Sequence, residues 1–369
     1  QVTSSVAITH GIVGILMPLI LVLVMVRFFG ANRSWKEGLS IAPFAIFTGV
    51  SFVVPYMLVG VLLGPEFPSM IGAMVGLAIV VPAARKGFLL PKETWDFPES
   101  TSWPDEWIGN LQIKLDDVAG KAPMSTFKGW VPYVLLALFL VASRTIEPLR
   151  AALTSVNLNW ANIFGEAGVS GGVQPLYLPG GIILAVVFIT YFLHKMNPRQ
   201  MSAAVSESTK TIFGAGFVLI FTVPMVRILI NSGVNGADLV SMPVMMAQAV
   251  ANGVGGIYPF FAPAVGAMGA FIAGSNTVSN LMLAEFQFSI AETLGLSTAM
   301  MVALQAVGAA AGNMIAIHNV VAASATVGLL GREGTTIRKT IIPTIYYLVF
   351  TGFIAMIAFY VLGVTDPLM

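Results

Sequence analysis

The sequence contains no cysteine among its 369 residues. Disulfide bridges, thiolate nucleophiles and cysteine-ligated metals are therefore excluded. The only histidines, His10, His194 and His318, lie far apart in the chain, and none has the i, i+4 spacing of a helical zinc site. We therefore expect no metal site, no catalytic residues and no organic cofactor.

Charged residues are also scarce. They make up 9% of the chain, whereas soluble domains carry about 25%, and hydrophobic residues make up 57%. A soluble core cannot be built from such a sequence, which predicts an all-α polytopic membrane protein. The net charge of +1 argues against a nucleic-acid partner, because a phosphate-binding surface needs clustered Lys and Arg.

Apolar runs bounded by basic clusters set the predicted topology. Runs of this length can span a bilayer, and the positive-inside rule places the basic ends in the cytoplasm. The predicted spans are 9–29, 41–63, 69–84, 130–143, 176–193, 211–230 and 341–363. Residues 1–86 thus hold the first three helices, 87–129 a polar cytoplasmic loop, and 130–369 the remaining transmembrane domain. The chain has no recognisable signal peptide. It starts at Gln1, and the absence of an initiator Met suggests a fragment or a chain numbered from an internal residue.

The stretch between positions 232 and 332 must cross the membrane an odd number of times, because its two ends are predicted on opposite sides. The economical solution is a re-entrant hairpin at about 256–291, followed by a broken helix at about 296–330 that unwinds near 308–319. Three separate crossings satisfy the same parity.

Two clusters of small and amide residues interrupt this stretch, at 274–280 (GSNTVSN) and 308–319. Irregular backbone at membrane depth is tolerated where it is buried in protein or lines a wet cavity. Helix N-termini, hydroxyls and amides suit a small carboxylate. The candidate substrate-binding residues are Gly274, Ser275, Asn276, Thr277, Ser279, Asn280, Gly312, Asn313 and Asn319. The alternative is that these small residues serve helix packing. His318 could relay a proton, or it could cap a freed carbonyl.

Four segments carry a resemblance: GSNTVSN (274–280), residues 311–333, LGPEFPS (63–69) and PLYLPG (175–180). They resemble the lactate permease family of bacterial transporters. The resemblance covers this whole chain and corresponds to the C-terminal two thirds of family members. It implies an ion-transporter-type fold with a re-entrant hairpin, a discontinuous helix and inverted repeats, the first of them incomplete here. Ser275, Asn276 and Thr277 are similar to a Ser-Asn-Thr signature of related carboxylate transporters, where it touches ion and substrate.

The resemblance implies a symporter for small 2-hydroxymonocarboxylates, chiefly lactate and glycolate, with H+ as the coupling ion, in the bacterial inner (plasma) membrane. The alternatives are sodium coupling and a non-transporting fragment of such a permease. An intramembrane enzyme lacks a recognisable motif here, and a channel would favour ring-forming filter residues. The expected partners are the carboxylate and the lipid bilayer. The oligomeric state stays open, with a homodimer among the candidates.

Overall fold

The computed structural model describes residues 1–108, 124–162, 171–206, 208–209, 221, 224–225, 228, 231–327, 329 and 331–366. The chain forms two compact units, 1–112 with 218–369 and 113–217, and each is described by itself. Most of the predicted span 211–230 lies outside the described residues.

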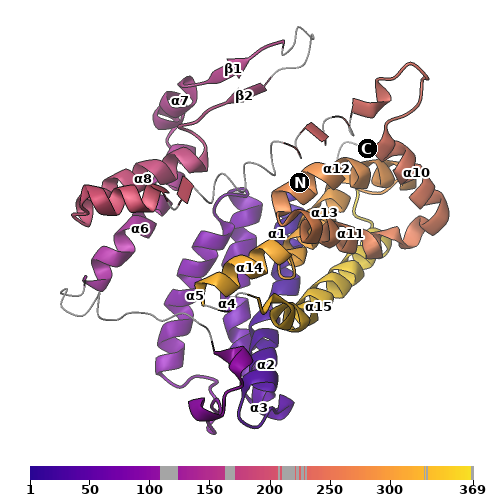
Figure 1. Cartoon of the computed structure of the whole chain (residues 1–369). Coiled ribbons are helices and arrows are strands. Elements are labelled where there is room, and N and C mark those ends of the chain that lie inside the picture. Colours follow the sequence, from indigo (N-terminus) through magenta and orange to yellow (C-terminus); the bar gives the residue numbers. More distant parts are fainter. Residues whose placement is uncertain are drawn as a thin grey trace. The chain divides into compact units, whose positions relative to one another are not determined.

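The first unit is built of helices (Figure 1). Its N-terminal part contains α1 (Val2–Gly14), α2 (Met17–Phe29), α3 (Trp35–Ser40), α4 (Ala42–Leu62), α5 (Pro68–Arg85), η1 (Ser100–Ser102) and η2 (Asp105–Trp107). Its C-terminal part contains η5 (Asn231–Gly233), α10 (Met242–Val254), η6 (Gly255–Ile257), α11 (Tyr258–Ala273), α12 (Asn276–Leu294), α13 (Thr298–Gly312), α14 (Ile317–Thr326) and α15 (Glu333–Tyr360).

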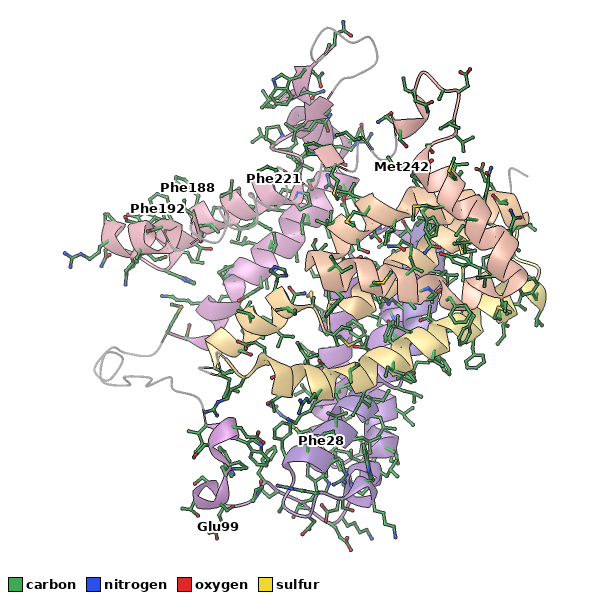
Figure 2. All side chains as sticks on the ribbon, turned by 45° about the vertical axis from the view of Figure 1, so that its right-hand side comes forward. Phe28, Glu99, Phe188, Phe192, Phe221 and Met242 are labelled. Atoms are coloured by element: carbon green, nitrogen blue, oxygen red, sulfur yellow. The ribbon has the colours of Figure 1, made fainter. Side chains whose placement is uncertain are left out.

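The second unit contains α6 (Thr126–Thr145), α7 (Glu147–Ser155), β1 (Leu158–Trp160), β2 (Gly171–Val173) and α8 (Pro179–Leu193). The two strands pair antiparallel, with Leu158 opposite Val173, between the predicted spans 130–143 and 176–193. Apolar side chains of α8, Phe188 and Phe192 among them, are exposed, as expected of a lipid-facing helix (Figure 2).

Helical structure is what the composition requires. In lipid the backbone N–H and C=O groups must be paired within the segment, and a helix does this. Six described helices or helix pairs are long and apolar enough to cross a membrane, or seven if the bent pair α1–α2 counts as one span. Proline stands at the first or second position of α2, α4, α5, α7, α8, α10 and α11, where its missing N–H costs nothing.

Two features differ from the predicted topology. The run 9–29 is not one helix: α1 and α2 meet at residues 15–16 and are bent by 41°. Apolar periodicity cannot reveal such a bend, because both halves are apolar. The stretch before the predicted hairpin also contains α10, which with η6 and α11 makes a 32-residue candidate span from Met242 to Ala273.

The buried core of the first unit lies around α11, α12 and α13, which pack side by side in Figure 1. Glycines on α13 allow its backbone to approach α11 closely. A Cβ placed on Gly308 would lie 1.9 Å from the carbonyl oxygen of Pro263, and one on Gly312 would lie 2.3 Å from that of Ala267. In the pairs Pro263–Gly308 and Ala267–Gly312, contacts move in the same direction along both helices, so α11 and α13 run parallel. Small residues four apart are typical of close helix pairs in membranes.

Helices α11 and α12 form an antiparallel hairpin, because Ser279 contacts Gly266 whereas Gln287, further along, contacts Ala262. The two helices span 258–294, over the segment 256–291 for which a re-entrant hairpin is predicted. Its re-entrant character and the inverted repeats stay predictions.

Candidate functional site

The first predicted interruption is a two-residue turn between α11 and α12. Gly274 has a φ of +68°, in the left-handed region that glycine adopts without strain. Ser275 caps α12, and its Oγ accepts a hydrogen bond from the N–H of Val278 at 3.4 Å. The turn is narrower than the predicted 274–280, because Asn276 already begins the helix. The reason is that one left-handed glycine and one capping serine suffice to reverse the chain.

The second interruption separates α13 from α14 at residues 313–316. It is also narrower than the predicted 308–319. Gly308 and Gly312 stay helical in the last turn of α13, and His318 belongs to α14. The amide Nδ2 of Asn319 donates to both the backbone oxygen and Oδ1 of Asn313, each at 3.3 Å. The two asparagines therefore bridge the break.

The two interruptions touch. A Cβ placed on Gly274 would lie 2.7 Å from Nδ1 of His318. The contact follows from the parallel packing of α11 and α13. Gly312, at the end of α13, lies level with Ala267, so the end of α11 lies level with the start of α14. The N-termini of α12 and α14 therefore lie at one place, and each N-terminus carries unpaired N–H groups and a partial positive charge.

The amides of Asn276 and Asn280 lie one turn apart at the start of α12. Nδ2 of Asn280 donates to Oδ1 of Asn276 at 3.1 Å. Oδ1 of Asn280 is buried and has no hydrogen-bond partner among the described residues. A buried acceptor without a partner is uncommon, and it is expected where a ligand or water completes the site.

Other predicted site residues lie differently. Thr277 and His318 are exposed. Ser279 is fully buried between helices, where its hydroxyl donates to the carbonyl of Gly266 at 2.8 Å. Gly312 faces the α11 backbone. In this structure Ser279 and Gly312 therefore make packing contacts.

A buried polar chain beside the hairpin was missed by the sequence analysis. The hydroxyl of Tyr258 donates to Oε1 of Gln287 at 2.9 Å, and Nε2 of Gln287 donates to Oε1 of Gln305 at 3.1 Å. Nε2 of Gln305 in turn donates to Oγ of Ser279 at 3.1 Å. Both glutamines are 0% exposed. The available signal was Gln305, the single amide of the apolar helix α13, since such a group needs an interhelical partner.

A second missed feature lies at the bend between α1 and α2. His10 forms a hydrogen bond through Nδ1 with the hydroxyl of Tyr347, and its ring lies edge-on to Tyr56 at 6.4 Å. These side chains line a mainly apolar cavity of about 800 Å³. Its other polar lining residues are Thr48 and Ser69.

The N-terminus of α13 is held by a carboxylate from the end of the described chain. Asp366 accepts hydrogen bonds from the hydroxyl of Ser297, and from the N–H and Oγ1 of Thr298, the last two at 2.7 Å. Burial raises the pKa of this carboxyl, but the hydrogen bonds outweigh it, so the pKa lies below its ordinary value. No group of three or more His, Asp or Glu able to hold a metal occurs in the described part of the chain.

The family model described as L-lactate permease matches residues 1–362. The chain belongs to the L-lactate permease family. It is similar to the putative L-lactate permease of Haemophilus influenzae, at 31% identity over 94% of this chain and 63% of the relative. It is also similar to the L-lactate permease of Bacillus subtilis, at 27% identity over 96% of this chain and 64% of the relative. The third relative is the glycolate permease GlcA of Escherichia coli, at 25% identity over 94% of this chain and 62% of that protein.

The chain thus spans slightly under two thirds of the length of these curated relatives. No solved structure matches it. Family membership and the apolar helices together identify a multi-pass membrane protein.

Proposed function

We propose that the chain carries the substrate-handling part of a secondary active transporter for small 2-hydroxymonocarboxylates such as lactate and glycolate. The names of the relatives, L-lactate permease and glycolate permease, support this substrate class. The bacterial sources of these relatives support a place in the bacterial inner membrane. No metal or organic cofactor takes part in this proposal.

The single observation that carries the proposal is the contact between the two interruptions, Gly274 against His318. A substrate carboxylate placed there would meet the N-termini of α12 and α14, whose unpaired N–H groups favour an anion. The free Oδ1 of Asn280 is an acceptor for the 2-hydroxyl group that lactate and glycolate share. The amides of Asn276, Asn313 and Asn319 supply further donors and acceptors.

We propose protons as the coupling ion and His318 as their carrier. Its exposed imidazole lies beside Gly274, at the proposed substrate position, and an imidazole can both accept and donate a proton. Sodium coupling is the alternative, and it would use carbonyl oxygens at the C-termini of α11 and α13 together with the asparagine oxygens.

The test is uptake of labelled lactate by proteoliposomes that contain the protein, driven by an imposed proton gradient or by a sodium gradient. Uptake driven by protons alone is expected. Asn276→Ala should reduce substrate binding about tenfold or more, which corresponds to the loss of one or two hydrogen bonds to a charged group. The control is Thr94→Ala, a change at an exposed position of the polar loop.

Equal binding by the two variants would contradict the site. Uptake that follows only the sodium gradient would contradict proton coupling and leave the site intact. No uptake under either gradient, with lactate binding retained, would identify the chain as a non-transporting part of a permease.

A further inference from the structure

A small cavity lies where the end of α2 meets the start of α15, at the basic end of these helices. The segment 96–108 of the polar loop covers it. The N–H of Ala31 donates to the oxygen of Asp96 at 3.0 Å, and the guanidinium of Arg332 donates to the oxygen of Asp105. The rings of Phe29 and Trp107 lie 5.0 Å apart. These contacts fix the loop against both helices.

The cavity has a volume of about 330 Å³, and positive charge predominates in its lining. Arg33, Arg338 and Lys339 face it, against the single acid Glu106. Within the described part of the chain, none of the three cations lies within 4.0 Å of a carboxylate. Lys339 donates to the backbone oxygen of Thr335 at 3.2 Å, which leaves further N–H donors of its ammonium free.

The other part of the lining is apolar and aromatic. Phe28 and Trp107 contribute to the wall, and Nζ of Lys339 lies 5.9 Å from the ring centre of Phe28 and 5.2 Å from that of Phe29. Figure 2 shows Phe28 on α2, beside the first half of α15. A cationic rim beside an apolar wall suits a ligand that carries an anionic group and an apolar body.

The position of the cavity favours a lipid. The basic ends of membrane helices lie at the cytoplasmic surface, where anionic phospholipids attract Lys and Arg. The start of α15 adds the partial positive charge of a helix N-terminus. Glu106 is an acceptor, which suits hydroxyl groups on the head group rather than a second phosphate.

We propose that this cavity binds the phosphate of an anionic phospholipid, with a glycerol-type head group facing Glu106 and the acyl chains leaving past Phe28 and Trp107. The site is separate from the carboxylate site at Gly274 and does not depend on the transport proposal. A free phosphate ester shares the anionic chemistry but would make no use of the apolar wall.

The experiment measures lipid binding to the purified full chain in detergent, by native mass spectrometry and by thermal unfolding. The probes are phosphatidylglycerol, phosphatidylcholine, and glycerol 3-phosphate as the free ester. Phosphatidylglycerol should bind and raise the unfolding temperature, whereas the other two should not. If glycerol 3-phosphate bound as tightly as the lipid, the proposal that the ligand is a phospholipid would be contradicted.

The variant Arg338→Gln/Lys339→Gln should lose about tenfold or more in affinity for phosphatidylglycerol, as expected for two basic side chains near the head group. Its matched control is Arg85→Gln/Lys86→Gln. This change removes two exposed charges from the end of α5, outside the cavity, and should leave the affinity unchanged within about twofold. Equal losses in both variants would show general adsorption to an anionic surface and overturn the proposal.

A third variant keeps the test decisive if the double variant fails to fold. Glu106→Gln removes the one negative charge at an exposed position but keeps an oxygen that can accept from the head group, so it should strengthen phosphatidylglycerol binding severalfold. Unchanged or weaker binding by this variant would count against the cavity as the binding site.

Discussion

The helix breaks of the first unit lie in two regions that are built on different principles. At residues 15–16, between α1 and α2, the surroundings are mainly apolar and open onto a cavity of about 800 Å³. At Gly274–Ser275 and 313–316 the turns are close-packed, with Gly274 against the side chain of His318, and amide side chains lie beside them. The break at residues 15–16 borders a cavity, whereas the breaks at Gly274–Ser275 and 313–316 bring helix ends together.

The histidines of the two regions differ in the same way. His10 is held by a hydrogen bond to Tyr347 and by the Tyr56 ring. His318 is exposed, and the described residues offer it no hydrogen-bond partner. A fixed imidazole contributes to stability, whereas a free one is available to a substrate or a proton. The comparison therefore predicts a structural role for His10 and agrees with the proton-carrying role that we propose for His318.

The largest expected effect tests the close packing at the second region. Gly308→Ala places a Cβ 1.9 Å from the carbonyl oxygen of Pro263, so α11 and α13 must move apart. We expect a loss of about 3 kcal/mol or failure to fold, as for overpacked cores. The measurement is thermal unfolding in detergent, with folded yield by size-exclusion chromatography.

The matched control is Gly129→Ala, in α6, where a new Cβ meets nothing within 4 Å. It should be neutral or stabilising, because alanine has the higher helix propensity. Similar unfolding temperatures for the two variants would show that the helices are not in close contact at Gly308.

The next effect concerns the polar chain beside the hairpin. Gln287→Leu leaves the hydroxyl of Tyr258 and Oε1 of Gln305 without their partners, and we expect a loss of about 2 kcal/mol. The double variant Gln287→Leu/Gln305→Leu should lose less than the sum of the single changes, because each removes a group that the other leaves unpaired. Additive losses would contradict a connected chain.

Substitution of each histidine tests the different roles assigned to His10 and His318. His10→Phe removes the hydrogen bond to Tyr347 and should lower stability by about 1 kcal/mol. His318→Gln should leave the unfolding temperature unchanged and weaken the dependence of lactate uptake on the proton gradient. Unfolding and uptake are measured on both proteins. A stability loss at His318 with none at His10 would reverse the assignment.

The smallest effect belongs to the anchor of α13. Asp366→Asn should cost about 0.5 kcal/mol at pH 7, because the helix N-terminus loses its negative charge. The pKa of this carboxyl is lowered by folding, so its contribution is present above the unfolded pKa near 4 and disappears as the pH falls through the folded value. Unfolding scans from pH 7 to pH 3 should show the two proteins converging at the acid end. A constant difference would contradict the ionic cap.

The positions of the interruptions were predictable, but their widths were not. Gly274 and Ser275 indicate the end of one helix and the cap of the next. Gly312 and Asn313 likewise indicate a helix end. The width of each break depends on local hydrogen bonds that the order of residues does not reveal. Oγ of Ser275 accepts from the N–H of Val278, and Nδ2 of Asn319 donates to Asn313 across the second break. The contact between the two interruptions, Gly274 against His318, could not be predicted, because it depends on the parallel packing of α11 and α13.

The bend at residues 15–16 and the His10–Tyr347 pair could not be predicted. Both halves of the run 9–29 are apolar, and His10 and Tyr347 lie at opposite ends of the chain. The contact of Ser279 could likewise not be predicted, since nothing local distinguishes a hydroxyl that faces a ligand from one that donates to the carbonyl of Gly266.

The sequence by itself determined that the chain is a helical membrane protein, because a backbone surrounded by this many apolar side chains has to pair its own polar groups. It also determined where the helices end, because glycine, proline and serine act on their own backbone. Only the tertiary structure decided which polar side chains face one another. That choice depends on helix contacts between residues far apart in the chain, and no local pattern encodes them.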